Sequence, residues 1–239
     1  MLNDVQNGIS QTLLIDADDT LWENNIYFER AIADFISFLN HHEFTREEVR
    51  ERLNQVERES IKTHGYGLNG FADALCKTFA GLSVQPLTPE LREQIHGLAF
   101  RIADNPVEII AGVPETLAHL SGRNHHLILM TKGAPAEQAS KIERSGLKDY
   151  FAAVEVVSEK NAASYQAAAE KYGLDPDVTW MVGNSPRSDV NPALEAGLHA
   201  VFVPHDMTWV LEHDEIVEPS KPGQKLLKLE RFAQLQSHF

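Results

Sequence analysis

The sequence is poor in cysteine and has no long apolar segment. Cys76 is the single cysteine in 239 residues, which excludes an internal disulfide framework, and its helical surroundings favour a small core residue. No apolar run approaches the ~18–20 residues that a membrane-spanning helix needs, and no signal-peptide pattern precedes the first apolar segment. We therefore expect a cytoplasmic protein.

Positive charge is also scarce. Lysine and arginine together number 21 against 35 aspartates and glutamates, and the formal net charge is −14. This excess of negative charge argues against general affinity for nucleic acid or anionic membranes, so an anionic ligand needs a local positive site. The adjacent pairs His41–His42 and His125–His126 point apart on any regular element, which disfavours a histidine metal site.

One stretch near the start of the chain carries most of the chemistry. The apolar run 13–15 predicts a buried strand, and it ends abruptly in three carboxylates, Asp16, Asp18 and Asp19. Like charges this close together are costly without a cation, so the stretch predicts a bound divalent metal, and oxygen ligands favour Mg²⁺. Asp16 and Asp18 could divide the roles of nucleophile and proton donor.

Other interpretations of this stretch stay open. A calcium loop is disfavoured, because such a loop requires glycine at its sixth position and glutamate at its twelfth, where Leu21 and Tyr27 stand. An Asp-x-Asp pair can also hold the metal of a sugar-nucleotide transferase, or it can form a solvated turn. The rest of the chain has to distinguish between these.

Residues 25–104 predict an all-helical insertion, within a chain whose length suits one large domain. Apolar residues recur at helical spacing, and we expect helices over about 26–40, 45–62, 71–79 and 89–103. Thr45 with Glu48 predicts a capping box. The glycine-rich link 64–71 is either a flexible connector or a loop that approaches a ligand, with candidate contacts from Lys62, Tyr66 and Asn69.

From residue 105 onward, strand and helix patterns alternate. We expect strands over about 126–130, 153–157, 178–182 and 199–203, with helices between them. The alternation predicts an α/β fold with a doubly wound parallel sheet covered on both faces, built from residues 1–24 and 105–239. After residue 204 we expect Trp209 and Leu211 to pack on the core, and a final helix over 226–232.

Polar groups follow each of the expected strands. The Thr-Lys-Gly turn at 131–133 suits an anion resting on backbone N–H groups, Lys160 follows the next strand, and the stretch 184–189 after the fourth is rich in oxygen ligands. Ligands of parallel sheets bind at the carboxyl ends of the strands, which meet at one edge. We therefore expect these groups to gather around Asp16.

The ordered set of motifs resembles that of the haloacid dehalogenase (HAD) superfamily, whose members are mostly magnesium-dependent phosphatases. The matching residues are Asp16-Ala17-Asp18-Asp19-Thr20, Thr131, Lys160 five residues before Tyr165, and Gly183-Asn184 through Asp189. The resemblance covers nearly the whole chain. It implies a Rossmann-like catalytic core with a helical cap domain, residues 25–104, inserted after the first motif.

The resemblance also implies a role for each motif residue. Asp16 is then the nucleophile that forms an aspartyl-phosphate, and Asp18 is the general acid and base. Thr131 and Lys160 complete the catalytic set by holding the phosphoryl group and stabilising its charge. Substrate contacts are expected from Thr20, Lys132, Lys62, Tyr66 and Asn69, and Mg²⁺ ligands from Asp16, the Asp18 backbone carbonyl, Asn184 and Asp189.

Three positions bear on the choice within the family. Many relatives begin the fourth motif with Gly-Asp, so Asn184 in that place makes Asp189 the better metal-ligand candidate. Dehalogenating relatives lack the second aspartate of the first motif, so Asp18 argues against dehalogenation. Lys62 leaves open the Schiff-base role that a cap lysine has in phosphonate-cleaving relatives.

The expected function is that of a magnesium-dependent phosphomonoesterase acting on a small phosphorylated metabolite through an aspartyl-phosphate. We expect a monomer or homodimer with no nucleic-acid or membrane partner. Two alternatives remain. One is a phosphotransferase or phosphomutase of the same superfamily, and the other is a non-catalytic regulatory protein that binds a phosphate ligand.

Overall fold

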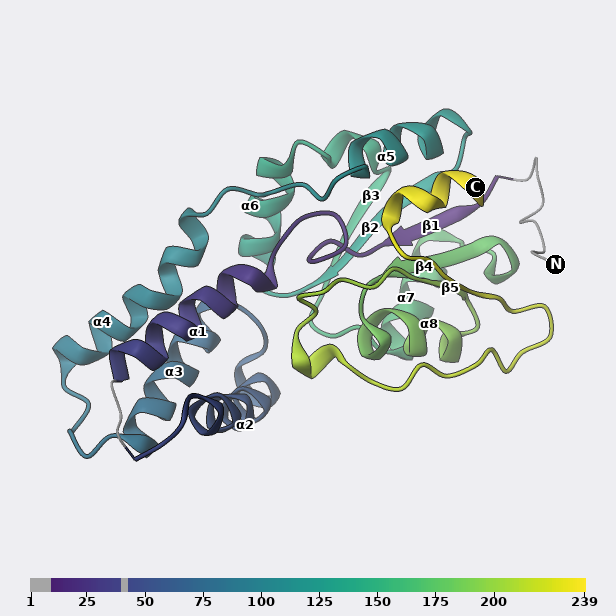
Figure 1. Cartoon of the computed structure of the whole chain (residues 1–239). Helices are drawn as coiled ribbons and strands as arrows, with labels where there is room; N and C mark the ends of the chain where they lie inside the picture. The colour runs from purple at the N-terminus through teal and green to yellow at the C-terminus, as the bar shows by residue number, and fades with distance from the viewer. Residues whose placement is uncertain (1–9, 40–42) are drawn as a thin grey trace. The chain divides into compact units, whose positions relative to one another are not determined.

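The chain divides into two compact units, seen in a computed structural model that describes residues 10–39 and 43–239. The first, here named the core unit, comprises Met1–Glu23 and Val107–Phe239, and the second, the cap unit, comprises Asn24–Pro106. Figure 1 shows the chain leaving the core unit after its first strand, β1, and returning to it before helix α5. The helical insertion therefore follows directly on the carboxylate-rich stretch.

The core unit is built on one parallel sheet of six strands in the order β3-β2-β1-β4-β5-β6. The strands are β1 (Thr12–Ile15), β2 (His126–Lys132), β3 (Ala153–Val157), β4 (Thr179–Gly183), β5 (His199–Phe202) and β6 (Leu226–Lys228). From β1 the chain builds outward through β2 and β3, then returns to the other side of β1 for β4. This order confirms the prediction of a doubly wound sheet. The direction in which strands are added reverses between β1 and β4, which is therefore the switch point of the sheet.

Helices cover both faces of the sheet, because alternate side chains of each strand point to opposite faces. The helices of the core unit are α5 (Val113–Gly122), α6 (Pro135–Ser145), α7 (Ala162–Tyr172) and α8 (Asn191–Ala196). On β1, Leu13 and Ile15 pack in a cluster with residues of α5 and α6, whereas Leu14 packs in a cluster with residues of α7 and α8. The central strand is therefore buried on both sides.

The end of the chain differs from the prediction of a final helix over 226–232. Leu226–Lys228 forms the edge strand β6, which pairs in parallel with Ala200–Phe202 of β5. A short 3₁₀ helix, Phe232–Ser237, follows it. The expectation was wrong because three residues are too few to show a period, and pairing with an open sheet edge outweighed local helical preference. Leu211 is buried, as expected.

The cap unit consists of helices packed around their own apolar core. They are α1 (Asn25–Leu39), α2 (Arg46–His64), α3 (Leu68–Leu82) and α4 (Pro89–Phe100), followed by a 3₁₀ turn at Arg101–Asp104. The capping box is present, because the Glu48 N–H donates to Thr45 Oγ1 at 3.2 Å and the Thr45 N–H to Glu48 Oε2 at 2.8 Å. Cys76 is buried in α3, as predicted. The helix end expected at Asn40 lies outside the described residues.

The glycine-rich link is shorter than the sequence suggested. Helix α2 runs to His64 and α3 begins at Leu68, so Asn69 lies in the first turn of a helix. Gly65 and Gly67 have φ of 71° and 131°, values that disfavour a side chain. None of the helices in the described ranges combines the length and the apolar character of a membrane span.

Candidate active site

Polar side chains converge where the parallel strands of the core unit end. The ladder between β1 and β4 continues one residue beyond Ile15, because the Asp16 N–H donates to the Val182 carbonyl at 2.9 Å. Asp16 is thereby fixed at the carboxyl end of the central strand, and Lys160 follows β3 at the same edge. Pro186–Val190 forms a single π-helical turn after β4, a distortion common at functional sites.

Lys160 is the centre of this cluster. Its ammonium group donates to Asp16 Oδ1 and, at 2.8 Å, to Asp189 Oδ1, and its side chain is 1% exposed. Burial alone lowers the pKa of Lys160, but the charges of Asp16 and Asp189 outweigh that effect and hold the pKa above its ordinary value. The site therefore keeps a fixed positive charge beside the carboxylate that was predicted to be the nucleophile.

Asp189 is fully buried, and both of its carboxylate oxygens have partners. Oδ1 receives Lys160, and Oδ2 accepts the Ser185 N–H at 2.9 Å. Burial, aided by the charge of Asp16 and opposed by Lys160, raises the pKa of Asp189 to about 7. The carboxylates of Asp16 and Asp189 thus share the single ammonium group of Lys160. Two negative charges beside one positive charge favour the binding of a further cation.

The side chains of Asn184 and Thr20 add further oxygen atoms near the carboxylate of Asp16. The Thr20 hydroxyl donates to Asp16 Oδ2 at 2.9 Å and lies 3.3 Å from Asn184 Oδ1. Asn184 Nδ2 donates to Thr208 Oγ1 at 2.9 Å, and this contact turns Oδ1 toward Asp16. Carboxylate and amide oxygens are the ligands that Mg²⁺ prefers, so the residues present fit this ion.

The side chain of Asp18 lies in a second, adjacent set of contacts. Its carboxylate accepts Trp22 Nε1 at 2.7 Å, Gln138 Nε2 at 3.0 Å and Lys141 Nζ at 2.6 Å to each oxygen. Burial raises the pKa of Asp18, but Lys141, assisted by Gln138 and Trp22, lowers it more, so the pKa lies below its ordinary value. Sequence reasoning identified Asp18 but none of these partners.

The end of β2 carries Thr131 and Lys132. Thr131 is buried at the strand end. Lys132, predicted to contact substrate, donates to Glu212 Oε1 at 2.5 Å and to Ser188 Oγ at 2.6 Å, and it lies 3.6 Å from Glu159. Its charge is therefore shared with carboxylates of the protein, and no local pattern in the sequence indicates these contacts.

Glu212 is a further residue that sequence reasoning missed. It ends the short 3₁₀ helix Val210–Glu212, and its Oε2 accepts the Ser185 hydroxyl at 2.6 Å. Burial raises the pKa of Glu212, but Lys132 lowers it more, so the pKa lies below its ordinary value. The contacts join residues 27 and 80 positions apart in the chain, a separation that no local motif reveals. The segment that contains Glu212 thus helps to hold the loop from Ser185 to Asp189 in place.

The predicted cap contacts all lie in the cap unit. Lys62 lies in the last turn of α2, where it is exposed and 3.0 Å from Glu59. Tyr66 lies in the link, and Asn69 lies in α3. Their contact with substrate stays a prediction.

A carboxylate–histidine group also lies in the core unit. Asp19, Glu23 and His205 place potential ligand atoms within 4.8 Å of one another. However, His205 Nδ1 accepts the Met207 N–H at 3.2 Å, and Nε2 lies 3.2 Å from Glu23 Oε2. Because both ring nitrogens of His205 already have partners, we interpret this group as a set of polar contacts that stabilises the segment after β5.

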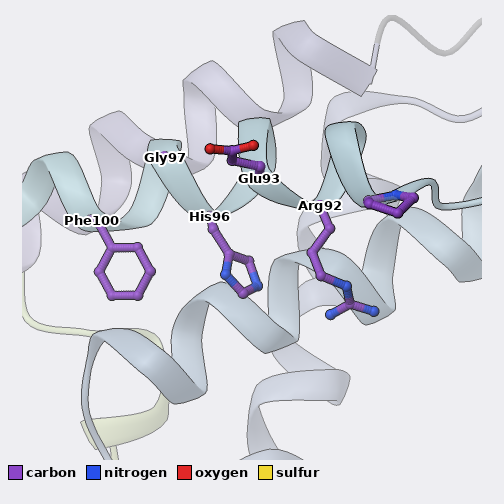
Figure 2. A pocket seen from close by; sticks show the side chains of 6 residues that line it. Arg92, Glu93, His96, Gly97 and Phe100 are labelled. Atoms are coloured by element: carbon purple, nitrogen blue, oxygen red, sulfur yellow. The ribbon is translucent and has the colours of Figure 1, made fainter.

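A surface pocket of about 500 Å³ lies on the cap unit along α4. Figure 2 shows Arg92, His96 and Phe100, spaced four residues apart, projecting from one side of that helix. Arg92 and His96 lie 3.9 Å and 3.7 Å from the Asp73 carboxylate. The pocket contains none of the residues predicted for catalysis, so we do not assign the chemistry to it.

Comparison with known proteins defines the family. A family model described as haloacid dehalogenase-like hydrolase matches residues 11–197, a span that includes every core motif described above. The chain therefore belongs to the haloacid dehalogenase-like hydrolases, and the predicted superfamily and hydrolase class are confirmed.

Similar proteins include two phosphatases and a solved structure. The glyceraldehyde 3-phosphate phosphatase of Methanothermobacter thermautotrophicus is 24% identical over 233 residues, which cover 95% of this chain and 98% of that protein. The phosphoserine phosphatase of Thermus thermophilus is 33% identical over 92 residues, 36% of this chain and 37% of that protein. A haloacid dehalogenase-like family hydrolase from Xanthomonas campestris has a TM-score of 0.81 and 29% identity, covering 98% of this chain and 92% of that one. The prediction of a phosphatase-type hydrolase agrees with these relatives.

Proposed function

We propose that the protein is a magnesium-dependent phosphomonoesterase that hydrolyses a small phosphorylated metabolite through an aspartyl-phosphate on Asp16. The observation that carries this proposal is the placement of the Lys160 ammonium group between the Asp16 and Asp189 carboxylates, at the end of the central strand. The names of the similar phosphatases support the same reaction class. We assign catalysis to residues 1–24 and 105–239 and the cap to residues 25–104.

In the first step, a carboxylate oxygen of Asp16 forms a bond to phosphorus while the bond from phosphorus to the leaving oxygen breaks. The electron pair of that bond stays on the leaving oxygen, which takes a proton from Asp18 and departs as an alcohol. Asp18 is ionised and paired with Lys141 in this structure, so it must leave that ion pair and take up a proton before this step. Lys160 and Thr131 stabilise the transferred group during this step. Thr20 holds Asp16 in place through its 2.9 Å hydrogen bond.

In the second step, water attacks phosphorus and the bond to Asp16 breaks. Asp18 takes the proton that the water loses, so both carboxylates return to their starting states and phosphate leaves. The proton that Asp18 gave in the first step is thereby restored.

The Mg²⁺ ligands we assign are Asp16, Asn184, Asp189 and the backbone carbonyl of Asp18. When bound there, Mg²⁺ neutralises negative charge, which lets one anion approach another. Support for this assignment comes from the excess of carboxylates around Lys160 and from the orientation of Asn184 by Thr208.

The substrate class that we propose is the phosphate monoester of a small molecule. The similar phosphatases are named for glyceraldehyde 3-phosphate and phosphoserine, which are both esters of this kind. The identity of 24% to the first leaves the particular ester to experiment.

The proposal is tested by phosphate release from a panel of small phosphate esters, with and without Mg²⁺, for the wild type and Asp16→Asn. We expect turnover that requires Mg²⁺ and vanishes in the variant, because an amide oxygen is a poor nucleophile. Asp149→Asn, which alters an exposed carboxylate of the core unit, is the matched control and should behave as the wild type.

Two other outcomes identify the alternative functions. Transfer of the phosphoryl group to an added alcohol, with no release to water, would identify a phosphotransferase. Binding of inorganic phosphate and Mg²⁺ by a folded protein without turnover of any ester would identify a regulatory protein.

A further inference from the structure

The conformation of one loop determines where the Asp189 carboxylate lies. Oδ2 of Asp189 accepts the Ser185 N–H at 2.9 Å, and the Asp189 N–H donates to the Ser185 carbonyl, also at 2.9 Å. Both contacts lie within the loop that contains the π-helical turn Pro186–Val190. They fix Asp189 relative to its own loop, so contacts with other elements must fix the loop relative to Lys160.

Ser188, the residue before Asp189, makes such contacts. It is 2% exposed, and its N–H, hydroxyl and carbonyl all have partners. The N–H donates to Ser185 Oγ at 2.9 Å, the hydroxyl accepts Lys132 Nζ at 2.6 Å, and the carbonyl accepts the Tyr165 hydroxyl at 2.8 Å. Lys132 belongs to β2 and Tyr165 to α7, so two elements of the core unit hold the peptide next to Asp189.

Pro192 removes one donor that the Ser188 carbonyl would otherwise have. Ser188 lies just before α8, and the second residue of that helix is Pro192. The α-helical bond from residue 192 back to the carbonyl of residue 188 cannot form, because proline has no N–H. A buried carbonyl without a donor is costly. The hydroxyl of Tyr165 supplies a donor from a different helix.

Tyr165 is itself firmly held. It lies in the first turn of α7, it is fully buried, and it packs in a cluster with Leu14 of β1 and Met181 of β4. Burial, aided by the charge of Asp189, raises the pKa of Tyr165 well above its ordinary value. The phenol therefore stays neutral and remains a hydrogen-bond donor, and the packing of its ring fixes the direction of its hydroxyl.

Lys160 and Tyr165 contact adjacent parts of the Asp189 loop. Lys160 donates to Asp189 Oδ1 at 2.8 Å, and Tyr165 holds the carbonyl group that is bonded to the Asp189 nitrogen. One short segment thus restrains both the carboxylate and the backbone of Asp189. Sequence reasoning used Tyr165 only to match the motif of Lys160 and gave it no role.

We propose that Tyr165 is a positioning residue, whose hydroxyl holds the loop at Ser188 so that the Asp189 carboxylate is oriented for Mg²⁺. The inference rests on the proposed function, since it takes Asp189 as a ligand of Mg²⁺. Its physical basis is that an ion binds more tightly when the protein holds the ligands in place before the ion arrives. Loss of the hydroxyl frees the Ser188 carbonyl, and Asp189 shifts with it.

The experiment replaces Tyr165 with phenylalanine, which keeps the ring and removes the hydroxyl. Calorimetric titration with Mg²⁺ measures the dissociation constant of the ion in the absence of substrate, and phosphate release measures turnover. We expect Tyr165→Phe to raise the dissociation constant for Mg²⁺ by about tenfold. At saturating Mg²⁺, kcat and KM should stay within about threefold of the wild type, because the bound ion selects the same arrangement of ligands.

Thermal unfolding separates this role from a structural one. Tyr165→Phe should lower Tm without Mg²⁺, because a buried hydrogen bond is lost. The rise in Tm that a given Mg²⁺ concentration produces should also be smaller than in the wild type, because stabilisation by a ligand depends on its dissociation constant. A purely structural role would lower Tm equally with and without Mg²⁺.

Tyr172→Phe is the matched control. Tyr172 ends the same helix, and its hydroxyl donates to Glu155 Oε2 at 2.7 Å. This variant loses a hydrogen bond through the same substitution without altering the contacts of Ser188. We expect its dissociation constant for Mg²⁺ to equal that of the wild type.

An unchanged dissociation constant for Mg²⁺ in Tyr165→Phe would overturn the positioning role while leaving the phosphomonoesterase intact. An equal rise in Tyr172→Phe would also overturn it, because the effect would then not depend on Ser188. A wild type that binds no Mg²⁺ and releases no phosphate from any ester would overturn the proposed function, and the inference with it. The two failures are therefore distinguishable.

Discussion

The side chain of Asp189 fills the space that a β-carbon on Gly183 would occupy. Such a carbon would lie 2.8 Å from the β-carbon of Asp189 and closer still to its carboxylate. Glycine at the end of β4 therefore allows Asp189 to turn back toward Lys160. We predict that Gly183→Ala displaces Asp189 and lowers kcat by at least about tenfold, with a loss of stability of about 1–3 kcal/mol from overpacking.

Steady-state kinetics and thermal unfolding check this prediction. Gly122→Ala, at the end of α5, is the control, since a β-carbon there meets no atom within 4 Å. The control should have the kcat of the wild type and be at least as stable, because alanine is favoured over glycine in a helix. Normal activity in Gly183→Ala would mean that Asp189 can hold its place without the glycine.

The convergence of Asp16, Lys160 and Asp189 could be predicted from the sequence because parallel topology imposes it. Once the alternation of strands and helices is recognised, the residues after each strand must meet at one edge of the sheet. The same logic located Asn184, although it could not show that Thr208 orients its amide. The periodicity of the sequence and the order of its strands and helices are therefore enough to predict most of the fold.

Glu212, Gln138 and Lys141 could not be predicted in the same way. Each reaches the site through a side-chain contact across more than 25 residues of chain, and its neighbours in the sequence give no sign of a partner. Charged residues on a helix such as α6 are ordinarily taken as a solvated face. Only the three-dimensional packing shows that Lys141 turns inward to Asp18.

Glu212 connects Lys132 with the loop that carries Asp189. Because its pKa lies below the ordinary value, the ionised form stabilises the fold above the unfolded pKa, and this contribution is lost as the pH falls through the lower folded pKa. We predict that Glu212→Gln costs about 1–3 kcal/mol near neutral pH, because Lys132 loses its nearest charge partner. The cost should shrink in acid, which urea titrations at several pH values would reveal.

The loss of Glu212 should also loosen Ser185 and thereby Asp189. We expect a moderate decrease in kcat, smaller than in Gly183→Ala, since Lys160 continues to hold Asp189. Glu218→Gln, in an exposed pair 3.6 Å from Lys228, is the control. A stability cost for Glu212→Gln that is the same at every pH would contradict the assigned ion pair.

Asn184 offers a test of the metal site. Replacing it with aspartate adds a negative charge beside Asp16 and should tighten Mg²⁺ binding by about tenfold, since affinity rises with the charge of the ligands. The variant should be less stable without Mg²⁺, because three carboxylates then share one ammonium group. Calorimetric titration with Mg²⁺ measures the first effect, and thermal unfolding with and without the ion measures the second.

The control for this charge is Asn124→Asp, at an exposed turn of the core unit. It adds the same charge away from the site and should not change Mg²⁺ affinity. Unchanged affinity in Asn184→Asp would mean that residue 184 does not contact the ion, leaving Asp16 and Asp189 as its side-chain ligands.

Glu57 is a buried carboxyl group of the cap unit. Its Oε2 has no hydrogen-bond partner among residues 10–39 and 43–239, and Arg50 is already bound to Glu29 through two contacts of 2.5 and 2.7 Å. Burial raises the pKa of Glu57 from 4.5 to about 7, with Arg50 opposing the shift and Glu29 adding to it. The folded state therefore binds a proton more tightly than the unfolded state does.

This shift predicts that the cap unit loses stability as the pH rises from about 4.5 to about 7, because over this range the folded protein still binds a proton that the unfolded chain has lost. Glu57→Gln removes the ionisation, so it should match the wild type near pH 4.5 and exceed it by about 3 kcal/mol above pH 7. Urea unfolding at both pH values, followed by circular dichroism, measures the difference. Glu59→Gln, in the exposed pair with Lys62, should show no such gain. A Glu57→Gln variant no more stable than the wild type above pH 7 would mean that Glu57 ionises there at no cost.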